Sequence, residues 1–398
     1  MQRALEGMVV LDFTRYIAGP YAAYLLGHLG AYVIKVEKAI TGDDFRMYPP
    51  FYNGESLAFP SYSSDKHSLS MDLRNDRAKE ILRELLPHVD IVMQNFRAGT
   101  IEKMGFDWET IHKINPRIIM ANNSGFGQYG PYSKRVAFDS IIQSESGLIN
   151  SLLESGAERP YYPGGNNSDH IGALCFVSAI MAAINGRDRT GVGQYLEVDM
   201  MSAVTNMFSS ELSLYAAAGG RTRIDDLAPC GYFHDKSEQV IHISCPASLW
   251  NKFKEVTEIN SLNDEMFSSI QSRIAHANEL NCLIDKWTAE RDGVDIVQTL
   301  ENVKIGAAVV KDYKDIVTDK HGKAINAFVE LDVPYVGKAL YPAIPFKLSD
   351  SPIEYGRVPK MGEDNYEVLH RFLDMDEETV EELTKEGVLY QAEHARWK

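Results

Sequence analysis

The chain has 398 residues, 44% of them hydrophobic, which is enough to bury the core of one or two domains. Its formal net charge of -16 argues against a nucleic-acid-binding protein, because such proteins need a basic face. A small phosphate-bearing ligand is compatible with this charge, since a local cluster of lysine and arginine is enough to bind it. The N-terminal stretch lacks the apolar run of a signal peptide, and no run of about eighteen apolar residues predicts a membrane span. We therefore expect a cytoplasmic protein with no membrane or nucleic-acid partner.

The first half of the chain alternates between short apolar runs and longer amphipathic stretches. Strand, helix and strand following each other within about thirty residues predict βαβ units with a parallel sheet. Gly19-Pro20 opens the first helix and Gly30 ends it, which is the usual placement of these residue types. The predicted strands span 8–13, 31–37, 90–96, 117–123 and 194–200, and the predicted helices span 20–30, 75–88, 107–115, 169–186 and 201–220.

The pattern changes after the Gly219-Gly220 pair. Single strands at 239–244 and 305–311 stand among helices such as 278–290, which is typical of a smaller α+β domain. The last part is strand-like and punctuated by proline, and it ends in a helix at 376–387. We therefore divide the chain into a large α/β domain (1–220), a small α+β domain (221–325) and a C-terminal segment (326–398).

The four cysteines carry no sign of a metal site. They are far apart and show no C-x-x-C spacing, so free thiols are expected and a zinc site is not. Their positions are 175, 230, 245 and 282.

A G-x-G-x-x-G pattern follows the predicted strand at 117–123, with its glycines at 125, 127 and 130. A dinucleotide-binding turn needs a helix directly after it, whose N-terminus meets the pyrophosphate. Here Pro131-Tyr132-Ser133 and then Lys134-Arg135 predict an extended loop instead. The pattern disfavours a nicotinamide-dependent dehydrogenase, and the glycines are better explained by a strand-end loop that passes close to a ligand or another backbone.

Asp169 stands directly before a long apolar helical stretch, 171–184. From the residues alone, a helix N-cap is the better explanation, because a carboxylate there accepts the unpaired backbone N–H groups. A nucleophilic role is compatible with that position, since the helix dipole and the N–H groups keep a carboxylate ionised. Ionised carboxylate is the form that attacks an acyl group.

Taken together, these stretches resemble the class III CoA-transferases, the family of formyl-CoA transferase and crotonobetainyl-CoA:carnitine CoA-transferase. The resemblance is strongest over residues 5 to 205, and PKMGEDNYEVL near the C-terminus also fits. The matching stretches, in order, are VLDFTRYIAGPYAAYLLGHLGAYVIKVEK, GDDFR, DKHSLSMDLR, VDIVMQNFRAGTIEKMGF, INPRIIMANNSGFGQYGPY, NNSDHIGAL and GVGQYLEVDM.

The resemblance implies a Rossmann-like large domain, a smaller α+β domain, a C-terminal segment that returns to the large domain, and an interlocked homodimer. It also implies transfer of CoA from an acyl-CoA to a free carboxylic acid, without a metal. The position that matches the family's nucleophile is Asp169, which would pass through mixed anhydrides and an aspartyl-CoA thioester. Backbone N–H groups of a glycine-rich loop would stabilise the oxyanions.

The same motif matches imply the residues that bind coenzyme A. CoA carries a diphosphate and a 3′-phosphate, which lysine and arginine bind. From the residues alone, a solvated surface charge is the better explanation of each basic side chain. The implied CoA-binding residues are Lys38, Arg74, Asn95, Phe96, Arg97 and Lys103.

The substrate pocket is assigned to Tyr16, Ile17, Phe138 and Asp139 by the same matches. Ile17 replaces the glutamine of formyl-CoA transferase, and no glycine run surrounds residues 245–253. Both departures predict an acyl group larger than formyl or oxalyl, such as a carnitine-like acid or a 2-hydroxy acid. Tyr161 and Tyr162 would add aromatic faces to this pocket. For any single aromatic residue, core or interface packing is the better explanation.

Two alternatives stay open. An acyl-CoA racemase or isomerase on the same fold would need a second proton-transfer group, which is a histidine in a G-H-D stretch of those relatives. Phe138 stands at that position here and cannot move a proton, and His170 is a weaker substitute. The second alternative is a non-catalytic acyl-CoA-binding subunit, which the presence of Asp169 disfavours.

Overall fold

The computed structural model describes residues 2–154, 159–219 and 227–392. Contacts within the chain divide it into two compact units. The large unit combines the residues up to Ser209 with those from Asn326 onward, and the small unit is Ser210–Ile325. The segment after Asn326 thus belongs to the unit that the N-terminal half builds.

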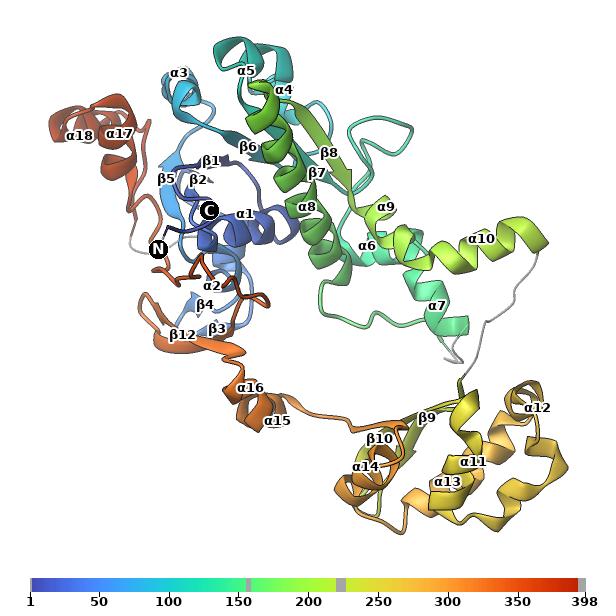
Figure 1. The fold of residues 1–398 in the computed structure, drawn as a ribbon. Coiled ribbons are helices and arrows are strands. Elements are labelled where there is room, and N and C mark those ends of the chain that lie inside the picture. Colours follow the sequence, from blue (N-terminus) through green and yellow to red (C-terminus); the bar gives the residue numbers. More distant parts are fainter. Residues whose placement is uncertain (1, 155–158, 220–226, 393–398) are drawn as a thin grey trace. The chain divides into compact units, whose positions relative to one another are not determined.

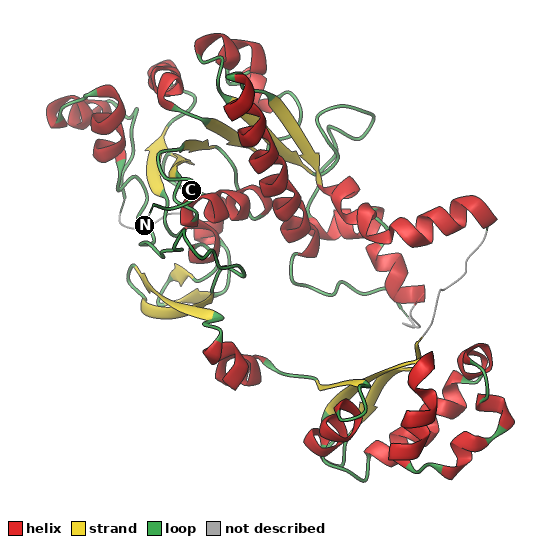
Figure 2. Cartoon of the chain, in the orientation of Figure 1, coloured by secondary structure: helices red, strands yellow, loops and turns green. Residues whose placement is uncertain are grey.

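A six-stranded sheet forms the centre of the large unit (Figures 1 and 2). Its strand order is β5-β2-β1-β6-β7-β8, and every neighbouring pair is parallel. The α/β prediction with a parallel sheet is therefore confirmed. The strands are β1 (Val9–Asp12), β2 (Tyr32–Lys38), β5 (His67–Met71), β6 (Ile91–Gln94), β7 (Ile119–Ser124) and β8 (Tyr195–Asp199).

The chain order changes direction between β1 and β6. From β1 the sheet grows outward through β2 and β5 on one side, and through β6, β7 and β8 on the other. At such a switch point the loops after the two central strands diverge, which opens a crevice at the carboxyl edge of the sheet. The loops that begin at Phe13 and at Asn95 leave the sheet at this place.

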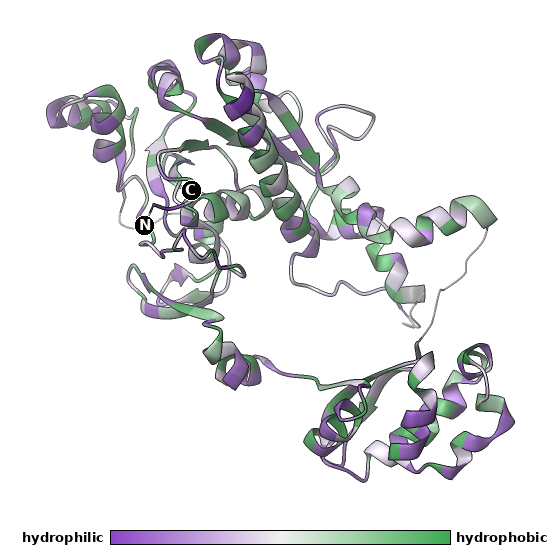
Figure 3. Ribbon diagram, in the orientation of Figure 1, coloured by the Kyte–Doolittle hydropathy of each residue, from purple (hydrophilic) through white to green (hydrophobic). Residues whose placement is uncertain are grey.

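Alternate residues of the strands face two separate cores, as the two-residue period of a strand requires. In β1, Val10 packs with α1 and α8, whereas Leu11 packs with the helices on the other face. In β6, Ile91 and Met93 belong to the first core and Val92 to the second. Burial on both faces explains why these strands are almost continuous apolar runs, which Figure 3 shows in green.

The helices of the large unit cover both faces of this sheet. The core that faces α1 and α8 is separate from the core that α3, α17 and α18 share with the opposite face. The helices are α1 (Ala18–His28), α2 (Pro60–Ser63), α3 (Asp76–Leu85), α4 (Thr100–Lys103), α5 (Trp108–Ile114), α6 (Asp139–Glu145), α7 (Leu148–Glu154), α8 (Asn167–Thr190), α9 (Met200–Thr205), α17 (Asn365–Leu373) and α18 (Glu377–Lys385). Two hairpins complete the unit, β3 (Phe51–Tyr52) with β4 (Glu55–Ser56) and β12 (Phe328–Val333) with β13 (Gly337–Pro342).

The longest helix, α8, is long and apolar enough to cross a membrane by length and composition alone, a test that core helices of soluble proteins also pass. One of its faces packs on the sheet through Phe176 and Ile180. Near its carboxyl end the buried Arg187 pairs with Asp90 at 2.8 Å. These contacts make α8 part of the core of the large unit.

The small unit has its own core around an antiparallel sheet with the order β11-β10-β9. Phe233, Ile241 and Phe253 lie in this core and are almost completely buried. Its elements are α10 (Ser209–Ala218), which begins at the boundary, β9 (Leu227–His234), β10 (Val240–Pro246), α11 (Trp250–Thr257), α12 (Ile270–Ala275), α13 (Ala277–Thr288), α14 (Gly293–Glu301), β11 (Gly306–Val309), α15 (Tyr313–Thr318) and α16 (Lys320–Ala324).

One helix prediction was wrong, and some strands were not predicted. The helix expected at 201–220 is broken into α9, a 3-10 turn and α10. Strands β5 and β9 were not predicted, because β5 contains two serines and β9 contains a proline and a glycine. The edge strand β5 is completed by the C-terminal segment, where Ser70 N donates to Asn365 Oδ1 at 2.9 Å and Tyr390 N donates to Ser70 O at 2.9 Å.

Candidate active site

The loop between β1 and α1 starts the candidate site. Tyr16 adopts a left-handed backbone conformation (φ 66), and Ile17 then occupies the N-cap position of α1 without a side-chain cap hydrogen bond. Asn95, directly after β6, holds this loop from both sides. It accepts a hydrogen bond from Arg15 N at 2.9 Å and donates one to Arg15 O at 2.7 Å. Asn95 therefore joins the two loops that diverge at the switch point.

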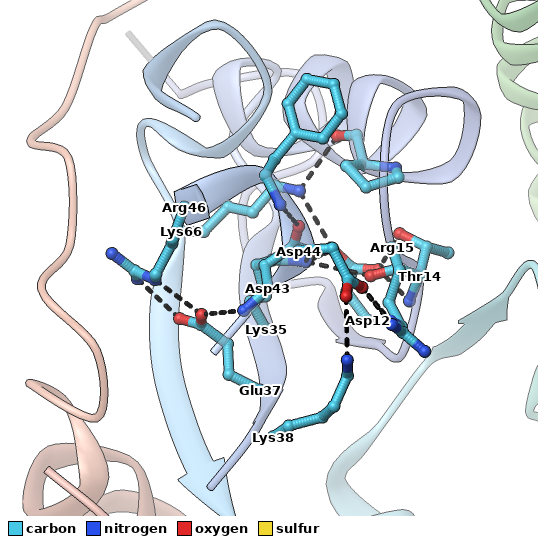
Figure 4. Close-up of polar contacts among 12 residues, drawn as sticks. Asp12, Thr14, Arg15, Lys35, Glu37, Lys38, Asp43, Asp44, Arg46 and Lys66 are labelled. Carbon is cyan, nitrogen blue, oxygen red and sulfur yellow. Dashed lines mark hydrogen bonds and ion pairs between the residues drawn. The ribbon is translucent and has the colours of Figure 1, made fainter. Parts of the chain in front are cut away.

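Next to this loop lies an inner tier of charges, which we define as Asp12, Lys35, Glu37, Asp43, Arg46 and Lys66 (Figure 4). All are buried except Arg46, whose side chain is 11% exposed. Lys66 Nζ contacts Asp12 Oδ2 at 3.0 Å, and Lys35 Nζ contacts Asp43 Oδ2 at 2.7 Å. Lys35 also donates to the backbone oxygen of Thr14 at 3.0 Å. Because an unpaired buried charge is costly, these contacts hold the start of the β1–α1 loop in one position.

An outer tier, which we define as Arg15, Lys38 and Asp44, lies next to it and is partly exposed (Figure 4). Asp44 Oδ2 accepts from Arg15 Nε at 2.5 Å, and Asp44 Oδ1 accepts from Lys38 Nζ at 3.0 Å. Burial raises the pKa of Asp44, but Arg15 and Lys38 outweigh it, so the pKa lies below its ordinary value. Asp44 is therefore an ionised bridge between two cations.

Asp169 lies in the first turn of α8. The predicted N-cap role is wrong for this residue, because α8 begins at Asn167 and the N–H groups of its first turn are bound by Asp139 of α6. Asp139 Oδ1 accepts from Ser168 N at 2.8 Å and from Asp169 N at 3.3 Å. Its other oxygen accepts from Tyr162 Oη at 2.6 Å and Gln143 Nε2 at 2.7 Å.

The protonation state of Asp169 also differs from the expectation that the helix N-terminus keeps it ionised. Burial, and secondly the neighbouring Asp139, raise the pKa of Asp169 from 3.8 to about 7. Removal from water and a like charge outweigh the helix dipole here, because Asp139 already occupies the N–H groups that would stabilise a second carboxylate. Asp169 therefore changes its charge near neutral pH.

Aromatic side chains line the region between Asp169 and the β1–α1 loop. Tyr16 contacts Phe138 edge-on, with ring centroids 6.2 Å apart, and Phe45 at 6.4 Å. Phe45 in turn contacts Tyr62 at 5.4 Å. Burial, and next the charge of Asp169, raise the pKa of Tyr62 to about 12, which places a neutral phenol near the carboxylate. Phe138 and Tyr16 are exposed, whereas Ile17 is buried.

His170, the alternative proton-transfer group, has partners of its own. Its Nδ1 lies 2.8 Å from the backbone oxygen of Asn166, and its ring contacts Tyr21 edge-on at 4.9 Å. The ring of Tyr62, which also contacts Tyr21, lies 5.9 Å from the ring of His170. These contacts explain His170 as a packed residue of the first turn of α8.

The contacts join several predicted site residues into one continuous row. Lys38 binds Asp44, Asp44 binds Arg15, and Tyr16 follows Arg15 in the chain. Tyr16 then contacts Phe138, whose neighbour Asp139 caps the helix of Asp169. The remaining candidates differ: Phe96 is partly buried, Arg74 is exposed and pairs with Asp72, and Arg97 and Lys103 are exposed with no side-chain partner among the described residues.

The glycine-rich loop after β7 is not a dinucleotide-binding turn, because no helix occurs between Gly125 and Phe138 in this described stretch. A Cβ at Gly125 would lie 2.0 Å from Ala137 Cβ, so this glycine permits a close approach of two chain segments. Gly127 has φ +84, and a Cβ there would lie 2.8 Å from Glu197 Oε1. The loop therefore packs against its own unit at two of its glycines.

Sequence reasoning missed Arg15, Asp44 and Tyr62. Arg15 carried a usable signal, because it is a charged residue directly after a buried strand at the carboxyl edge of the predicted sheet. Asp44 and Tyr62 carried none, since their roles depend on contacts with residues from other strands and helices.

One group of described residues has metal-ligand atoms close together, His67, Asp364 and Glu367. Asp364 is already bound, because its Oδ2 accepts from Ser68 N at 2.8 Å and its Oδ1 pairs with Arg357. This group thus fastens the C-terminal segment to β5, and it lies on other elements than the row that leads to Asp169.

Comparisons with known proteins identify the family and the fold. The family model for CoA-transferase family III matches residues 5–365. The β subunit of succinyl-CoA–L-malate CoA-transferase from Chloroflexus aurantiacus is 30% identical over 97% of this chain and 98% of its own length. Formyl-CoA:oxalate CoA-transferase from Afipia carboxidovorans is 29% identical over 98% of both chains.

Solved structures show the same architecture. A CAIB/BAIF family protein from Brucella suis has a TM-score of 0.82 and 27% identity, covering 94% of this chain and all of its own. Rv3272 from Mycobacterium tuberculosis supports the fold alone, with a TM-score of 0.79 at 24% identity over 92% of this chain and 98% of its own. The chain thus belongs to CoA-transferase family III, which confirms the resemblance. It is a transferase enzyme whose family uses CoA thioesters as co-substrates.

Proposed function

We propose that this enzyme moves CoA from an acyl-CoA to a free carboxylic acid through a thioester on Asp169. The observation that carries this proposal is the position of Asp169. It lies at the start of a helix and titrates near neutral pH. It is linked to the cations at the switch point by a row of residues that are in contact or adjacent in the chain. These properties suit a nucleophile that acts on an acyl-CoA whose phosphates bind the cations at the carboxyl edge of the sheet.

The reaction would use Asp169 twice. Its carboxylate oxygen attacks the thioester carbonyl, the C–S bond breaks, and the CoA thiolate leaves behind a mixed anhydride. The thiolate then attacks the side-chain carbonyl of Asp169, which releases the donor acid and forms the aspartyl-CoA thioester. The acceptor carboxylate attacks this thioester, and the released thiolate finally attacks the acceptor acyl group, which restores the carboxylate of Asp169.

The large unit is the proposed Rossmann-like CoA-binding domain. Lys38 and Asn95 lie at its switch point with Arg15, and Phe96, Arg97 and Lys103 follow in the loop and helix after β6. Arg97 and Lys103 have no competing side-chain partner among the described residues, so both remain free to bind phosphate. Arg74 is the weakest of these candidates, because Asp72 already binds its guanidinium by two hydrogen bonds.

The proposed acceptor or donor is an acid larger than formate or oxalate, such as a 2-hydroxy acid. Tyr16 and Phe138 present exposed rings next to Asp139, which suits a substrate with a carbon chain. The malate-using relative acts on a 2-hydroxy acid according to its name, and its identity to this chain is close to that of the oxalate-using relative. Sequence identity therefore does not choose between these acids, and the aromatic row carries this part of the proposal.

A homodimer in the cytoplasm is the proposed assembly. Helix α10 has no buried residue in the single chain, and its apolar residues Leu212 and Tyr215 are 48% and 63% exposed. In the other unit, Leu174 on α8 is 49% exposed. Apolar helix faces of this kind are usual where a second chain packs. The four cysteines are free thiols, as in a reducing compartment.

The test is intact-protein mass spectrometry after mixing the enzyme with a panel of acyl-CoAs, with hydroxylamine trapping beside it. A covalent CoA adduct on Asp169, absent from Asp169→Ala, is expected with one or two donors. Asp188→Ala is the matched control, because Asp188 is an exposed carboxylate near the other end of the same helix. An adduct that persists in Asp169→Ala would refute the nucleophile. Exchange of the substrate α-proton without any adduct would favour a racemase, and CoA binding without either signal would favour a binding subunit.

A further inference from the structure

The inner and outer tiers at the switch point differ in their formal net charge. The inner tier contains three carboxylates (Asp12, Glu37, Asp43) and three cations (Lys35, Arg46, Lys66), so its formal charge is 3 − 3 = 0. The outer tier contains two cations (Arg15, Lys38) and one carboxylate (Asp44), so its formal charge is 2 − 1 = +1. The buried part is thus self-compensated, and the accessible part keeps a positive surplus.

Exposure separates the two tiers in the same way. The side chains of Lys35 and Lys66 are fully buried, whereas those of Lys38, Arg15 and Asp44 are 41%, 31% and 25% exposed. Buried ion pairs cannot exchange partners with a ligand, but a partly exposed carboxylate between two cations can be replaced by another anion. The outer tier is therefore the part that a ligand can reach.

The position of Asp44 does not depend on its own ion pairs. Its neighbour Asp43 belongs to the inner tier, where it binds Lys35 and caps the 3-10 turn Asp44–Met47 by accepting from Phe45 N at 2.8 Å. Asp43 N also donates to Glu37 Oε2 at 2.8 Å. The backbone at residue 44 is thus fixed from the buried side, and the Asp44 carboxylate is held at the surface between Arg15 and Lys38 (Figure 4).

Arg15 and Lys38 are themselves fixed at the carboxyl edge of the sheet. Lys38 is the last residue of β2, and both backbone polar groups of Arg15 are bound by the Asn95 amide. Their side chains direct the Arg15 Nε and the Lys38 Nζ to one carboxylate. A phosphate oxygen at that place would find the same charge-assisted donors.

We propose that Asp44 is an internal counter-ion, which occupies the phosphate-binding donors of Arg15 and Lys38 in the free enzyme and is displaced by a phosphate group of CoA. This inference rests on the proposed function, because it takes CoA as the ligand of this edge. Asp44 weakens binding of the CoA moiety by competing for the two cations, and so favours release of the acyl-CoA product. Arg15 becomes a ligand of the phosphate in addition to Lys38.

The experiment compares the CoA affinity of wild-type enzyme, Asp44→Asn and Arg15→Gln by isothermal titration calorimetry. Asp44→Asn removes one negative charge next to a phosphate, so its Kd for CoA is expected to fall on the order of tenfold. Arg15→Gln is expected to raise that Kd on the order of tenfold. Glu84→Gln is the control, because it removes an equally negative partner of an exposed ion pair, with Arg77 on α3.

Pantetheine, which lacks every phosphate, separates this effect from a general change of the site. Its Kd is expected to be the same in wild type and Asp44→Asn. Tightening of CoA with 3′-dephospho-CoA unchanged would assign the 3′-phosphate to the outer tier, and equal tightening of both would assign the diphosphate. Equal tightening of pantetheine would overturn the proposal.

The inference and the proposed function fail in different ways. A wild-type enzyme that binds neither CoA nor any acyl-CoA would refute the proposed function. Wild-type binding with an unchanged or weaker affinity in Asp44→Asn would overturn the counter-ion alone and leave Asp44 as a structural bridge. Thermal unfolding checks the fold of each variant, and Asp44→Ser replaces Asp44→Asn if the latter does not fold.

Discussion

Replacing Asp139 by asparagine is expected to lower the pKa of Asp169. The pH at which adduct formation on Asp169 reaches half its maximum rate should fall with it. Asp139 Oδ1 lies 3.3 Å from Asp169 N, so the two carboxyl groups are neighbours at the start of α8. Burial is the larger cause of the raised pKa and remains in the variant, whereas the second cause, the charge of Asp139, is removed. Asparagine keeps one oxygen that can accept from Ser168 N.

The size of the change follows from Coulomb's law. Two unit charges on the order of 6 Å apart interact by about 0.7 kcal/mol in water and by about 2.8 kcal/mol at the dielectric typical of a protein surface. This range corresponds to about 0.5–2 pKa units, and we expect about one unit. The pKa of Asp169 would then fall from about 7 toward about 6.

The assay is the rate of adduct formation on Asp169 as a function of pH, measured by rapid quench and mass spectrometry. The ionised carboxylate is the nucleophile, so the wild-type rate should rise with pH, reach half its maximum near 7 and level off above it. In Asp139→Asn the midpoint should move down by about one unit, which makes the variant about fivefold faster near pH 6 if the maximum is unchanged.

Loss of a helix cap is the competing effect of this substitution. Asp107→Asn is the control, because Asp107 caps α5 by accepting from Thr110 N at 2.9 Å and belongs to another helix. Both variants should lose less than about 1 kcal/mol of unfolding free energy, because asparagine caps a helix about as well as aspartate, and only Asp139→Asn should shift the pH midpoint. An unchanged or higher midpoint in Asp139→Asn would refute the assignment of part of the raised pKa to its charge.

Three further substitutions test the packing around the site by denaturant unfolding. Lys66→Met should cost about 3–5 kcal/mol, because it leaves Asp12 of the inner tier without its 3.0 Å partner, and a loss below about 1 kcal/mol would contradict that role. Asn123→Val should stabilise the protein by about 1 kcal/mol, since both polar atoms of this buried amide lack a partner; destabilisation would indicate a buried water or ligand there. Gly125→Ala should cost about 2 kcal/mol or more, because its Cβ would meet Ala137 at 2.0 Å. Gly306→Ala serves as the comparison, because its Cβ would meet only ordinary contacts, the first at 3.5 Å.

The sequence predicted the central strands of the sheet, which are buried on both faces. Such strands are apolar runs, so β1, β2, β6 and β7 could be found from local composition. The edge strand β5 could not, because its stability depends on residues far along the chain. Ser70 and its partner Asn365 are separated by 295 positions, and no local pattern reports such a contact.

The candidate site was predictable in its residue types and not in its electrostatics. The resemblance selected Asp139 as a pocket residue and Asp169 as the nucleophile, and the position before a helix predicted that Asp169 stays ionised. The structure shows that Asp139 takes the N–H groups of that helix and raises the pKa of its neighbour. A pKa depends on burial and on every charge nearby, and both are properties of the folded chain.

The proposed reaction needs a carboxylate that is both ionised and basic, and the raised pKa of Asp169 meets both requirements. An aspartate with its ordinary pKa of 3.8 is fully ionised at neutral pH, but it is weakly basic and a correspondingly weak nucleophile. A pKa far above neutrality would make it basic but leave it protonated and unable to attack. At about 7, close to half of the molecules carry the ionised form at neutral pH, and that form is far more basic than a solvated aspartate. Binding of CoA brings further negative charge to the same edge, which would raise the pKa of Asp169 further. Displacement of the Asp44 carboxylate from Arg15 and Lys38 would offset part of that rise.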